Sequence, residues 1–262
     1  MSKMVLFDSH SHLNMEAFAA DLDEVLERAF AAGLVGVTVI GTTVADAIRA
    51  VEIASRHERV YATVGIHPHE VKEATEQGYQ VLRSLAAHDK VVAYGEIGLD
   101  FFRNHSPRPR QLEEFAYQLH LAGELELPVV IHDREAHREV LEIIRREHGY
   151  RHGGVIHCFS GDYRLAAAFV DLGFKISIPG TITFPKNQLQ AEVVRRLDLA
   201  DLLIETDCPY LAPVPFRGKR NEPLYVRYVA EAIAEIKQVA VEKVAEQTCR
   251  NAQDLFGIQE EA

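Results

Sequence analysis

The chain has 262 residues, of which 47% are hydrophobic and 26% are charged, and its formal net charge is −11. This length and composition are typical of a globular protein with one large domain or two small ones. The negative charge argues against a protein that coats nucleic acid with a general basic surface, but it is compatible with an enzyme that holds phosphates at one cationic spot. The three cysteines have no paired spacing, so neither a disulfide framework nor a cysteine zinc site is expected.

Targeting and membrane signals are not expected in this sequence. Its first apolar run, Val5–Phe7, is too short for the core of a signal peptide. No apolar run approaches the roughly 18 residues of a membrane-spanning helix. We therefore expect a cytoplasmic protein that does not bind membranes. The residues do not determine the oligomeric state, and a monomer is compatible with them.

Short segments rich in valine and isoleucine alternate with amphipathic segments along the whole chain. Strands that are covered on both faces have this composition. The first predicted helix carries apolar residues at helical spacing from Leu22 to Phe30 and ends at Gly33. The eight predicted strands are Met4–Asp8, Val35–Gly41, Val60–Ile66, Val91–Glu96, Val129–His132, Gly154–His157, Phe174–Ile178 and Leu202–Thr206.

Eight strands separated by helices predict an α/β fold, the closed (β/α)₈ or TIM barrel, which typically takes about 250 residues. An open doubly wound sheet is the alternative, but the first strand is not followed by a GxGxxG fingerprint. No linker divides the chain, so we expect a single domain over residues 1–262. The additional C-terminal helix, with apolar residues at helical spacing from Val241 to Phe256, is expected to pack on the outside of the barrel.

Residues that can bind metals follow most of the predicted strands, at the end where a barrel carries its chemistry. Because side chains alternate along a strand, the first two histidines, separated by Ser11, project from the same face. Each residue alone is compatible with an ordinary structural or surface role, but six at the same end of five strands predict a metal site. These residues are His10, His12, Glu96, His132, His157 and Asp207.

Four imidazoles and two carboxylates exceed the three or four protein ligands of one catalytic zinc, so they predict two divalent ions bridged by a carboxylate, for which Glu96 is well placed. Four histidines favour Zn²⁺, Mn²⁺, Ni²⁺ or Co²⁺ over Mg²⁺. By strand alternation, Cys158, Cys208 and Asp133 are expected to face away from the site. Asp8 is expected either to orient a histidine or to make a purely structural hydrogen bond.

Further polar residues lie in the loops that follow the same strands. His67 has no place among the ligands, so it is expected to donate a hydrogen bond to a phosphate or to a leaving oxygen, whereas His69 is expected to be exposed. The basic residues are either solvated charges or groups that bind flanking phosphates. They are Arg103, Arg108 and Arg110 after the fourth strand, and Arg217, Lys219 and Arg220 after the eighth.

Six short segments carry most of these polar residues, and in this order they resemble the TatD family of metal-dependent deoxyribonucleases, a branch of the amidohydrolase-like barrels. The sequence departs slightly from the family at Phe101-Phe102, where tyrosines are frequent, and at Cys208, where a small residue is common. The segments are Phe7–His12, Gly65–His69, Gly95–Asp100, His157–Gly161, Glu205–Tyr210 and Arg220–Pro223.

The resemblance implies a two-metal TIM-barrel hydrolase that cleaves phosphodiester bonds of DNA, usually described as Mg²⁺-dependent, with 3′–5′ exonuclease action on single strands in some members. It implies that one ion is held by His10, His12, Glu96 and Asp207, and the second by Glu96, His132 and His157.

The expected catalytic residues are Glu96, which bridges the ions, and Asp207, which also takes the proton from the attacking water. The expected substrate-binding residues are His67, Arg103 and Arg220, with DNA as the substrate.

Two other functions fit the same residues. The metal pair can polarise a carbonyl group, so the chain can instead hydrolyse an ester or amide, as in aminoacyl-tRNA deacylation or in a small-molecule amidohydrolase. It can also be a barrel with structural metals whose surface recruits a partner. The arginine-bearing loops favour a ligand that carries phosphate.

Overall fold

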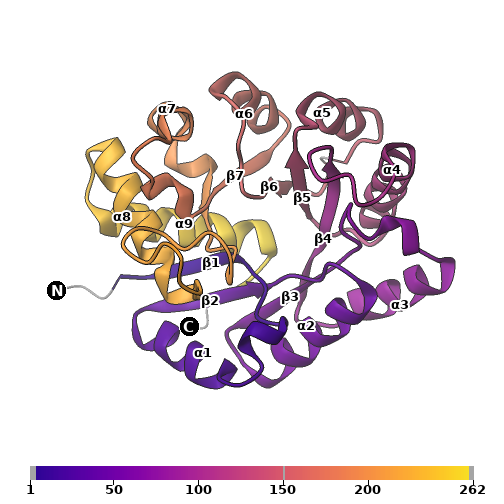
Figure 1. The fold of residues 1–262 in the computed structure, drawn as a ribbon, viewed down its shortest axis with the longest axis horizontal. Helices are drawn as coiled ribbons and strands as arrows, with labels where there is room; N and C mark the ends of the chain where they lie inside the picture. The colour runs from indigo at the N-terminus through magenta and orange to yellow at the C-terminus, as the bar shows by residue number, and fades with distance from the viewer. Residues whose placement is uncertain (1–3, 150, 260–262) are drawn as a thin grey trace.

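The computed structural model describes residues 4–149 and 151–259, in which strands alternate with α-helices (Figure 1). The strands are β1 (Leu6–Ser11), β2 (Leu34–Val39), β3 (Val60–Val64), β4 (Val91–Asp100), β5 (Val129–Arg134), β6 (Gly154–Ile156), β7 (Phe174–Ile178) and β8 (Leu202–Ile204). The α-helices are α1 (Leu22–Ala31), α2 (Val44–Arg56), α3 (Glu76–Ala86), α4 (Arg108–Glu124), α5 (His137–Arg146), α6 (Tyr163–Val170), α7 (Gln188–Arg196), α8 (Val226–Lys237) and α9 (Val241–Phe256). Short 3₁₀ turns occur at Glu16–Phe18, Val71–Glu73, Gly180–Thr183, Leu199–Asp201 and Pro223–Tyr225.

The strands form one parallel sheet in the order β1 to β8, which curls into a nearly closed barrel. Among the described residues, the main chain of β1 pairs with the segment after β8 near the carboxyl end, where Ser11 pairs with Cys208. There the His12 amide donates to the Cys208 carbonyl at 2.8 Å. The structure therefore confirms the predicted (β/α)₈ barrel and excludes the open doubly wound sheet.

Side chains hold the rest of the seam between β1 and β8. The Ser9 hydroxyl donates to the Ile204 carbonyl at 3.0 Å. The buried Asp8 carboxyl accepts hydrogen bonds from the amide and the hydroxyl of Thr206, at 2.9 and 2.6 Å. Of the two roles expected for Asp8, the structure shows the structural hydrogen bond, because these two bonds tie the ends of the barrel together.

Most predicted strand bounds agree with the structure to within a few residues, and β7 agrees at both ends. β4 runs to Asp100, four residues beyond the prediction. By contrast, β6 ends at Ile156 and β8 at Ile204, short of the predicted ends. The polar residues that follow β6 and β8 therefore lie outside the regular strand, where side chains need not alternate.

Two hydrophobic clusters stabilise the fold. The larger lies between the strands and the helices that surround them, and includes Leu26 of α1, Ala47 of α2 and Phe115 of α4 (Figure 1). The smaller contains residues of β1 to β6 and β8, among them Phe7, together with residues of α9, among them Phe256. None of the described helices has both the length and the apolar character needed to cross a membrane.

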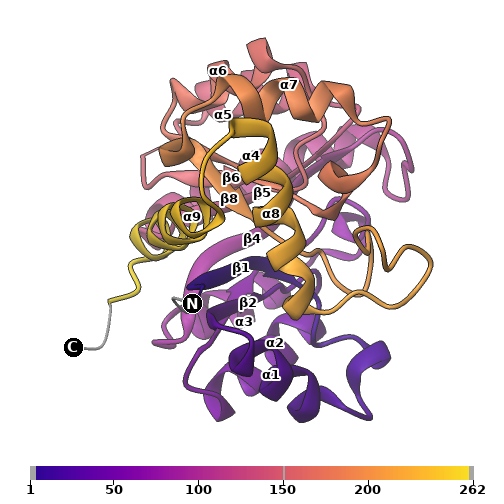
Figure 2. The same cartoon turned by 90° about the vertical axis from the view of Figure 1, so that its left-hand side faces the viewer.

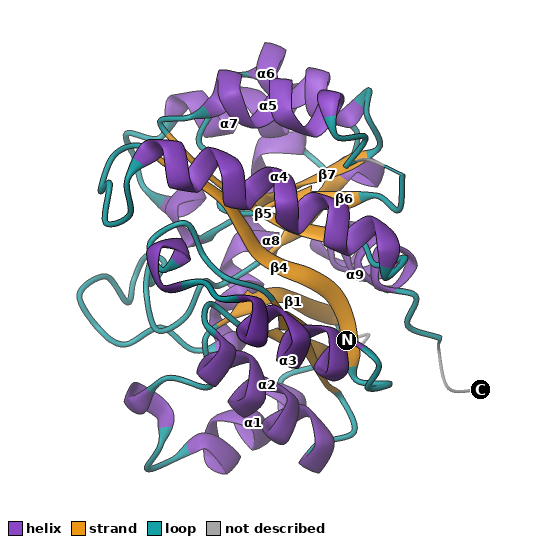
Figure 3. Cartoon of the chain, turned by 90° about the vertical axis from the view of Figure 1, so that its right-hand side faces the viewer, coloured by secondary structure: helices purple, strands orange, loops and turns teal. Residues whose placement is uncertain are grey.

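The last helix does lie outside the barrel, but at its end rather than at its side. α9 sits beside the start of β1 (Figure 2), and Phe256 packs against Phe7, with ring centroids 6.2 Å apart. Phe7 is the second residue of its strand, so α9 covers the amino-terminal end of the barrel. The loops at the opposite, carboxyl-terminal end lie away from α9 (Figure 3).

Candidate metal and substrate site

A cavity of about 1050 Å³ opens at the carboxyl-terminal end of the barrel. Five of the six predicted metal ligands line it, and His10 lies beneath them with 1% of its surface exposed. This is the end at which TIM barrels carry their chemistry, because the loops after every strand converge there. The lining ligands are His12, Glu96, His132, His157 and Asp207.

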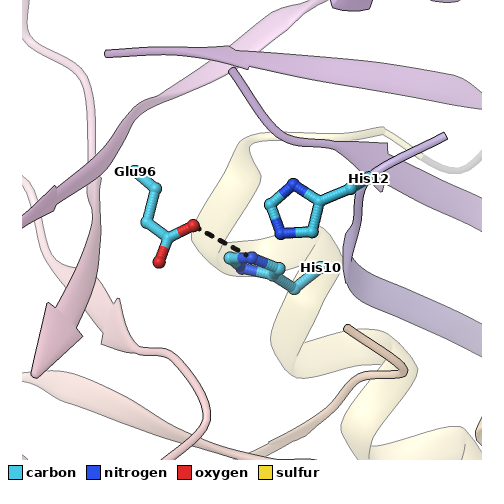
Figure 4. Close-up of side chains that lie close together, drawn as sticks. All are labelled: His10, His12 and Glu96. Carbon is cyan, nitrogen blue, oxygen red and sulfur yellow. Dashed lines mark ion pairs between the residues drawn. The ribbon is translucent and has the colours of Figure 1, made fainter. Parts of the chain in front are cut away.

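The first group of predicted ligands comes from β1, β4 and the segment after β8. His10 Nε2 lies 3.3 Å from Glu96 Oε2 and 3.9 Å from Asp207 Oδ1. His12 Nε2 lies 3.2 Å from the same Asp207 oxygen. Figure 4 shows His10 and His12 projecting toward the side of β4 that carries Glu96, as strand alternation predicts.

The second group gathers on the other oxygen of Glu96. Oε1 lies 2.8 Å from His132 Nδ1 and 3.7 Å from His157 Nε2. The rings of His10 and His157 stack with centroids 3.5 Å apart, so the two groups touch. Glu96 therefore presents one oxygen to each group, which is the arrangement that a bridging carboxylate requires.

Burial and neighbouring charges act in opposite directions on these groups. Burial by itself raises the pKa of Glu96, but the surrounding imidazoles hold it well below its usual value. Burial lowers the pKa of His132, whereas its hydrogen bonds to Asp100 and Glu96 raise it to about 9. The pKa of His157 is raised to about 10 in the same way, by Glu205 and Glu96 against the effect of burial. Ionised carboxylates and basic imidazoles thus stabilise one another.

His67 lies closer to the predicted ligands than expected. Its Nε2 is 3.5 Å from Glu96 Oε1, and its donor atom lies within 4.8 Å of those of Glu96 and His132. Its Nδ1 accepts a hydrogen bond from the His69 amide at 3.1 Å, so Nε2 carries the proton in the neutral ring. Burial and the neighbouring His132 lower the pKa of His67 to about 4, so this ring is neutral at pH 7.

Two carboxylates that are not among the predicted site residues contact the histidines of the second group. Asp100 Oδ2 lies 3.2 Å from His132 Nε2, and Glu205 Oε1 lies 3.0 Å from His157 Nδ1. Each thus contacts the ring nitrogen that faces away from Glu96. Asp100 lies four residues after Glu96 on β4, and this even spacing was a signal that could have identified it. Glu205 lies two residues before Asp207 but after the end of β8, where strand alternation does not apply.

Two expectations about neighbouring residues are wrong. Cys158 does not face away from the site, because it follows the end of β6, has a φ of 46° and lines the cavity. Its sulfur lies within 4.8 Å of donor atoms of His157 and Asp207. His69 is half-buried rather than exposed, and its Nε2 contacts Asp100 at 2.8 Å.

Cys208 and Asp133, which were also expected to face away from the site, have their contacts outside the predicted ligand set. Cys208 is fully buried in the larger core cluster, as predicted. Asp133 borders the cavity, but its carboxylate is turned to His137 of α5, 2.8 Å away.

The basic residues divide into those that reach the cavity and those that do not. Arg103 lines the cavity, and so does Arg134, which the sequence analysis did not select. Arg220 is not among the residues that line it. Its guanidinium binds Asp21 at 2.6 and 2.9 Å and also reaches Glu222 at 3.2 Å. The structure thus places Arg220 in a network of ion pairs beside the cavity.

A nearly closed parallel barrel with imidazoles and carboxylates gathered at the carboxyl ends of its strands defines the class of metal-dependent TIM-barrel hydrolases. Residues 7–257 match the family model described as TatD related DNase. The chain is 43% identical to the uncharacterized metal-dependent hydrolase YabD of Bacillus subtilis, across 97% of this chain and 100% of that protein. It is 35% identical to the 3′-5′ ssDNA/RNA exonuclease TatD of Salmonella typhimurium, across 97% and 99% of the two chains.

The crystal structure of YJJV, a TatD homolog from Escherichia coli K12, is similar to this one with a TM-score of 0.92. The two are 32% identical, and the match covers 97% of this chain and 98% of that one. The chain therefore belongs to the TatD family of metal-dependent hydrolases.

Proposed function

We propose that this protein is a divalent-metal-dependent deoxyribonuclease that removes nucleotides from the 3′ end of single-stranded DNA. The observation that carries the proposal is Glu96, which is buried and presents one oxygen to each of two groups of imidazoles. Two TatD relatives support the choice of substrate, since those of Salmonella typhimurium and Erwinia amylovora are both named 3′-5′ ssDNA/RNA exonucleases.

The residues present fit a pair of metal ions. Both ring nitrogens of His10 are buried and make no hydrogen bond to the described residues. Buried polar atoms without a partner are rare, and a metal ion would satisfy such a nitrogen. The donors would be His10, His12, Glu96 and Asp207 for one ion, and Glu96, His132 and His157 for the other.

When bound, two divalent ions supply Lewis acidity at the phosphoryl group and make hydroxide available near neutral pH. The excess of imidazole over carboxylate favours Zn²⁺, Mn²⁺, Ni²⁺ or Co²⁺ among the candidates. Metal dependence is a property of the family, and the choice of metal is part of the proposal.

The chain's own side chains then orient the site and move protons. Burial raises the pKa of Asp207, but its hydrogen bond from His12 and the nearby imidazoles outweigh burial and lower it. Asp207 is therefore ionised at neutral pH and can accept a proton from an attacking water molecule. His67, which is neutral at pH 7, can donate a hydrogen bond from its Nε2–H to a phosphoryl oxygen or to the leaving oxygen.

The proposal is tested with a single-stranded oligonucleotide labelled at its 3′ end, assayed with each candidate divalent ion and with a chelator. We expect labelled nucleotide to be released only with metal, and Asp207→Asn to slow the release by roughly 100-fold or more. Asp23→Asn, at an exposed position on α1, is the matched control and should behave like the wild type. No release with any ion, or equal release by Asp207→Asn, would show that the proposal is wrong.

A further inference from the structure

Among the described residues, Arg134 is the one arginine that lies on a barrel strand and lines the cavity. It is the last residue of β5 and follows His132 by two positions, so both side chains leave the same face of the strand. The neighbouring strand β4 fixes the backbone of Arg134. Asp100 pairs with Arg134 in the β4–β5 ladder, and the Phe101 amide donates a hydrogen bond to the Arg134 carbonyl at 2.9 Å. The side chain of Arg134 is therefore attached to a rigid strand, two residues from the predicted metal ligand His132.

Arg134 shares an aromatic platform with Arg103. Their guanidinium carbons lie 4.4 and 5.3 Å from the centroid of the same ring, that of Phe102. The two cations therefore occupy one small region of the cavity wall, and Phe102 itself is 48% exposed. Packing on a ring face holds a guanidinium by cation–π attraction and leaves its N–H edge free for a ligand.

Neither of these cations pairs with an anionic group of the described residues. Within residues 4–149 and 151–259, no carboxylate or carbonyl oxygen contacts the guanidinium of Arg103 or Arg134. Arg49, the other arginine that lines the cavity, is bound by Asp46 and by the Asn14 carbonyl. Two neighbouring cations without an anion repel each other, so an anion bound within reach of both would be stabilised by both.

One carboxylate connects this pair to the candidate metal site. Asp100 Oδ1 accepts hydrogen bonds from the amides of Phe102 and Arg103, at 3.0 and 2.7 Å. Its Oδ2 contacts His132 Nε2 at 3.2 Å. Asp100 therefore sets the position of the arginine-bearing turn relative to His132, and a ligand bound by the arginines is held at a defined offset from the metal ligands.

We propose that Arg103 and Arg134, supported by Phe102, form a subsite for the phosphate next to the one that is cleaved. This inference rests on the proposed nuclease function and narrows its substrate class to oligonucleotides with at least two internucleotide phosphates. The planar N–H edges of two arginines suit a phosphodiester, which offers two anionic oxygens. Because contacts to phosphate carry no direct information on the base, such a subsite would recognise backbone charge and not base identity.

The first test compares two thymidine trinucleotides that differ in one charge. In the analogue, the linkage adjacent to the scissile one is a neutral methylphosphonate. We expect the wild type to cleave the fully charged trinucleotide with a kcat/KM roughly tenfold higher or more, the usual contribution of a charge-assisted hydrogen bond. Arg134→Ala and Arg103→Ala should each reduce this preference, and Arg134→Lys should keep part of it.

Arg217→Ala is the matched control, because Arg217 also lies over a phenylalanine ring, Phe184 at 4.3 Å, but does not line the cavity. This variant should keep the full preference for the charged trinucleotide. A wild type without any preference, or Arg134→Ala with an unchanged one, would overturn the inference. Thermal melting of each variant separates loss of the subsite from loss of the fold.

The second test measures binding without cleavage, so that it stands apart from the nuclease proposal. A fluorescent phosphorothioate oligothymidylate, checked on a gel for integrity, is titrated with metal-loaded protein at several salt concentrations. For single strands, each phosphate contact contributes about 0.7 to the slope of log K against log salt. Arg134→Ala should lower the slope by about that amount, and Arg217→Ala should not change it.

The results of the two tests distinguish failure of the subsite from failure of the nuclease proposal. An Arg134-dependent slope without nucleotide release under any metal would leave the subsite standing and overturn the nuclease. Nucleotide release with a slope that does not depend on Arg134, or no measurable binding of the probe by the wild type, would overturn the subsite.

Discussion

At the scale of single residues, the imidazoles of His132 and His157 are each held between Glu96 and a second carboxylate. Asp100 contacts the far nitrogen of His132, and Glu205 contacts that of His157. A carboxylate on the far nitrogen fixes the tautomer and the orientation of a metal-binding histidine and makes it more basic. Glu205 also accepts a hydrogen bond from the Cys158 amide at 2.8 Å. Its carboxylate therefore cannot turn away from His157 without leaving that amide unpaired.

Removing either of these carboxylates should weaken metal binding. We expect Glu205→Ala to lower metal affinity by roughly 10- to 100-fold, the usual effect of losing such a partner. Glu205→Gln should cost less, because its amide oxygen can still contact His157 Nδ1 and accept the hydrogen bond from the Cys158 amide. Competition with a chromophoric chelator measures the affinity, with Glu192→Gln on the surface of α7 as control. Equal affinities for Glu205→Ala and the wild type would contradict this role.

The same residues predict how pH affects the metal-free protein. The pKa of Asp8 is raised to about 8 by burial, and those of His132 and His157 are raised to about 9 and about 10. A group whose pKa is higher in the folded state binds its proton more tightly there, so the stability it contributes is lost as pH rises through the folded pKa. We therefore expect the melting temperature of chelated protein to fall between pH 7 and 10.

Added metal should reduce this loss of stability, because binding replaces the protons on the histidines.

In the acid range, by contrast, stability is expected to fall as the pH falls. The lowered pKa values of Glu96 and Asp207 mean that the stability these carboxylates contribute is lost as pH falls below their ordinary pKa. A melting temperature of chelated protein that stays constant from pH 7 to 10 would be inconsistent with the raised pKa values.

At the scale of elements, the pairing of β4 with β5 places Gly98 opposite His132 and Asp100 opposite Arg134. Gly98 pairs with His132 in this ladder and has a φ of 139°. A side chain there would overlap the backbone of His132, including its carbonyl oxygen. Glycine at this position therefore allows the two strands that carry the second ligand group to approach each other closely.

Gly98→Ala should destabilise the protein by more than about 1 kcal/mol, since alanine fits neither the dihedral angle nor the space. Gly173→Ala is the matched control, because Gly173 also has a positive φ, of 85°, but no described atom apart from its own and those of its chain neighbours lies within 4 Å of the place that an added methyl group would occupy. Both variants should lose stability in urea unfolding, and only Gly98→Ala should also lose metal affinity. Unchanged metal affinity in Gly98→Ala would show that the β4–β5 spacing does not control the site.

At the scale of the whole molecule, the two ends of the barrel have separate tasks. α9 covers the amino-terminal end through a cluster that includes Phe7 and Phe256, while the cavity occupies the carboxyl-terminal end. Stability and chemistry are thus supported by different residues of the same strands. Residues at the α9 end can therefore affect folding without contacting the candidate site.

Truncation of Phe256 should separate these tasks. Phe256 is 5% exposed, so we expect Phe256→Ala to lower the free energy of unfolding by about 3 kcal/mol. Glu246→Ala, on the exposed face of α9, should change it by less than about 0.5 kcal/mol. Urea unfolding measures both, and metal stoichiometry of the folded protein should be the same in both. Loss of metal by folded Phe256→Ala would show that the two ends are coupled.

The barrel and the polar residues at the ends of its strands were accessible from the sequence because of two simple periodicities. Parallel strands joined by helices put all their carboxyl ends at one end of the barrel, and side chains alternate along each strand. His10 and His12 therefore meet Glu96 from β4 whatever the details of the loops. The same alternation applies to Arg134, two residues after His132 on β5, but not to Glu205, which follows the end of β8.

Only the tertiary structure decided what lies beyond the strand ends. Cys158 reaches the cavity because β6 has already ended and its backbone adopts a positive φ, so the alternation rule no longer applies. Arg220 does not line the cavity, because its guanidinium pairs with Asp21, which is 199 residues away in the chain. Such contacts depend on how loops and helices distant in sequence pack together, and no local periodicity encodes them.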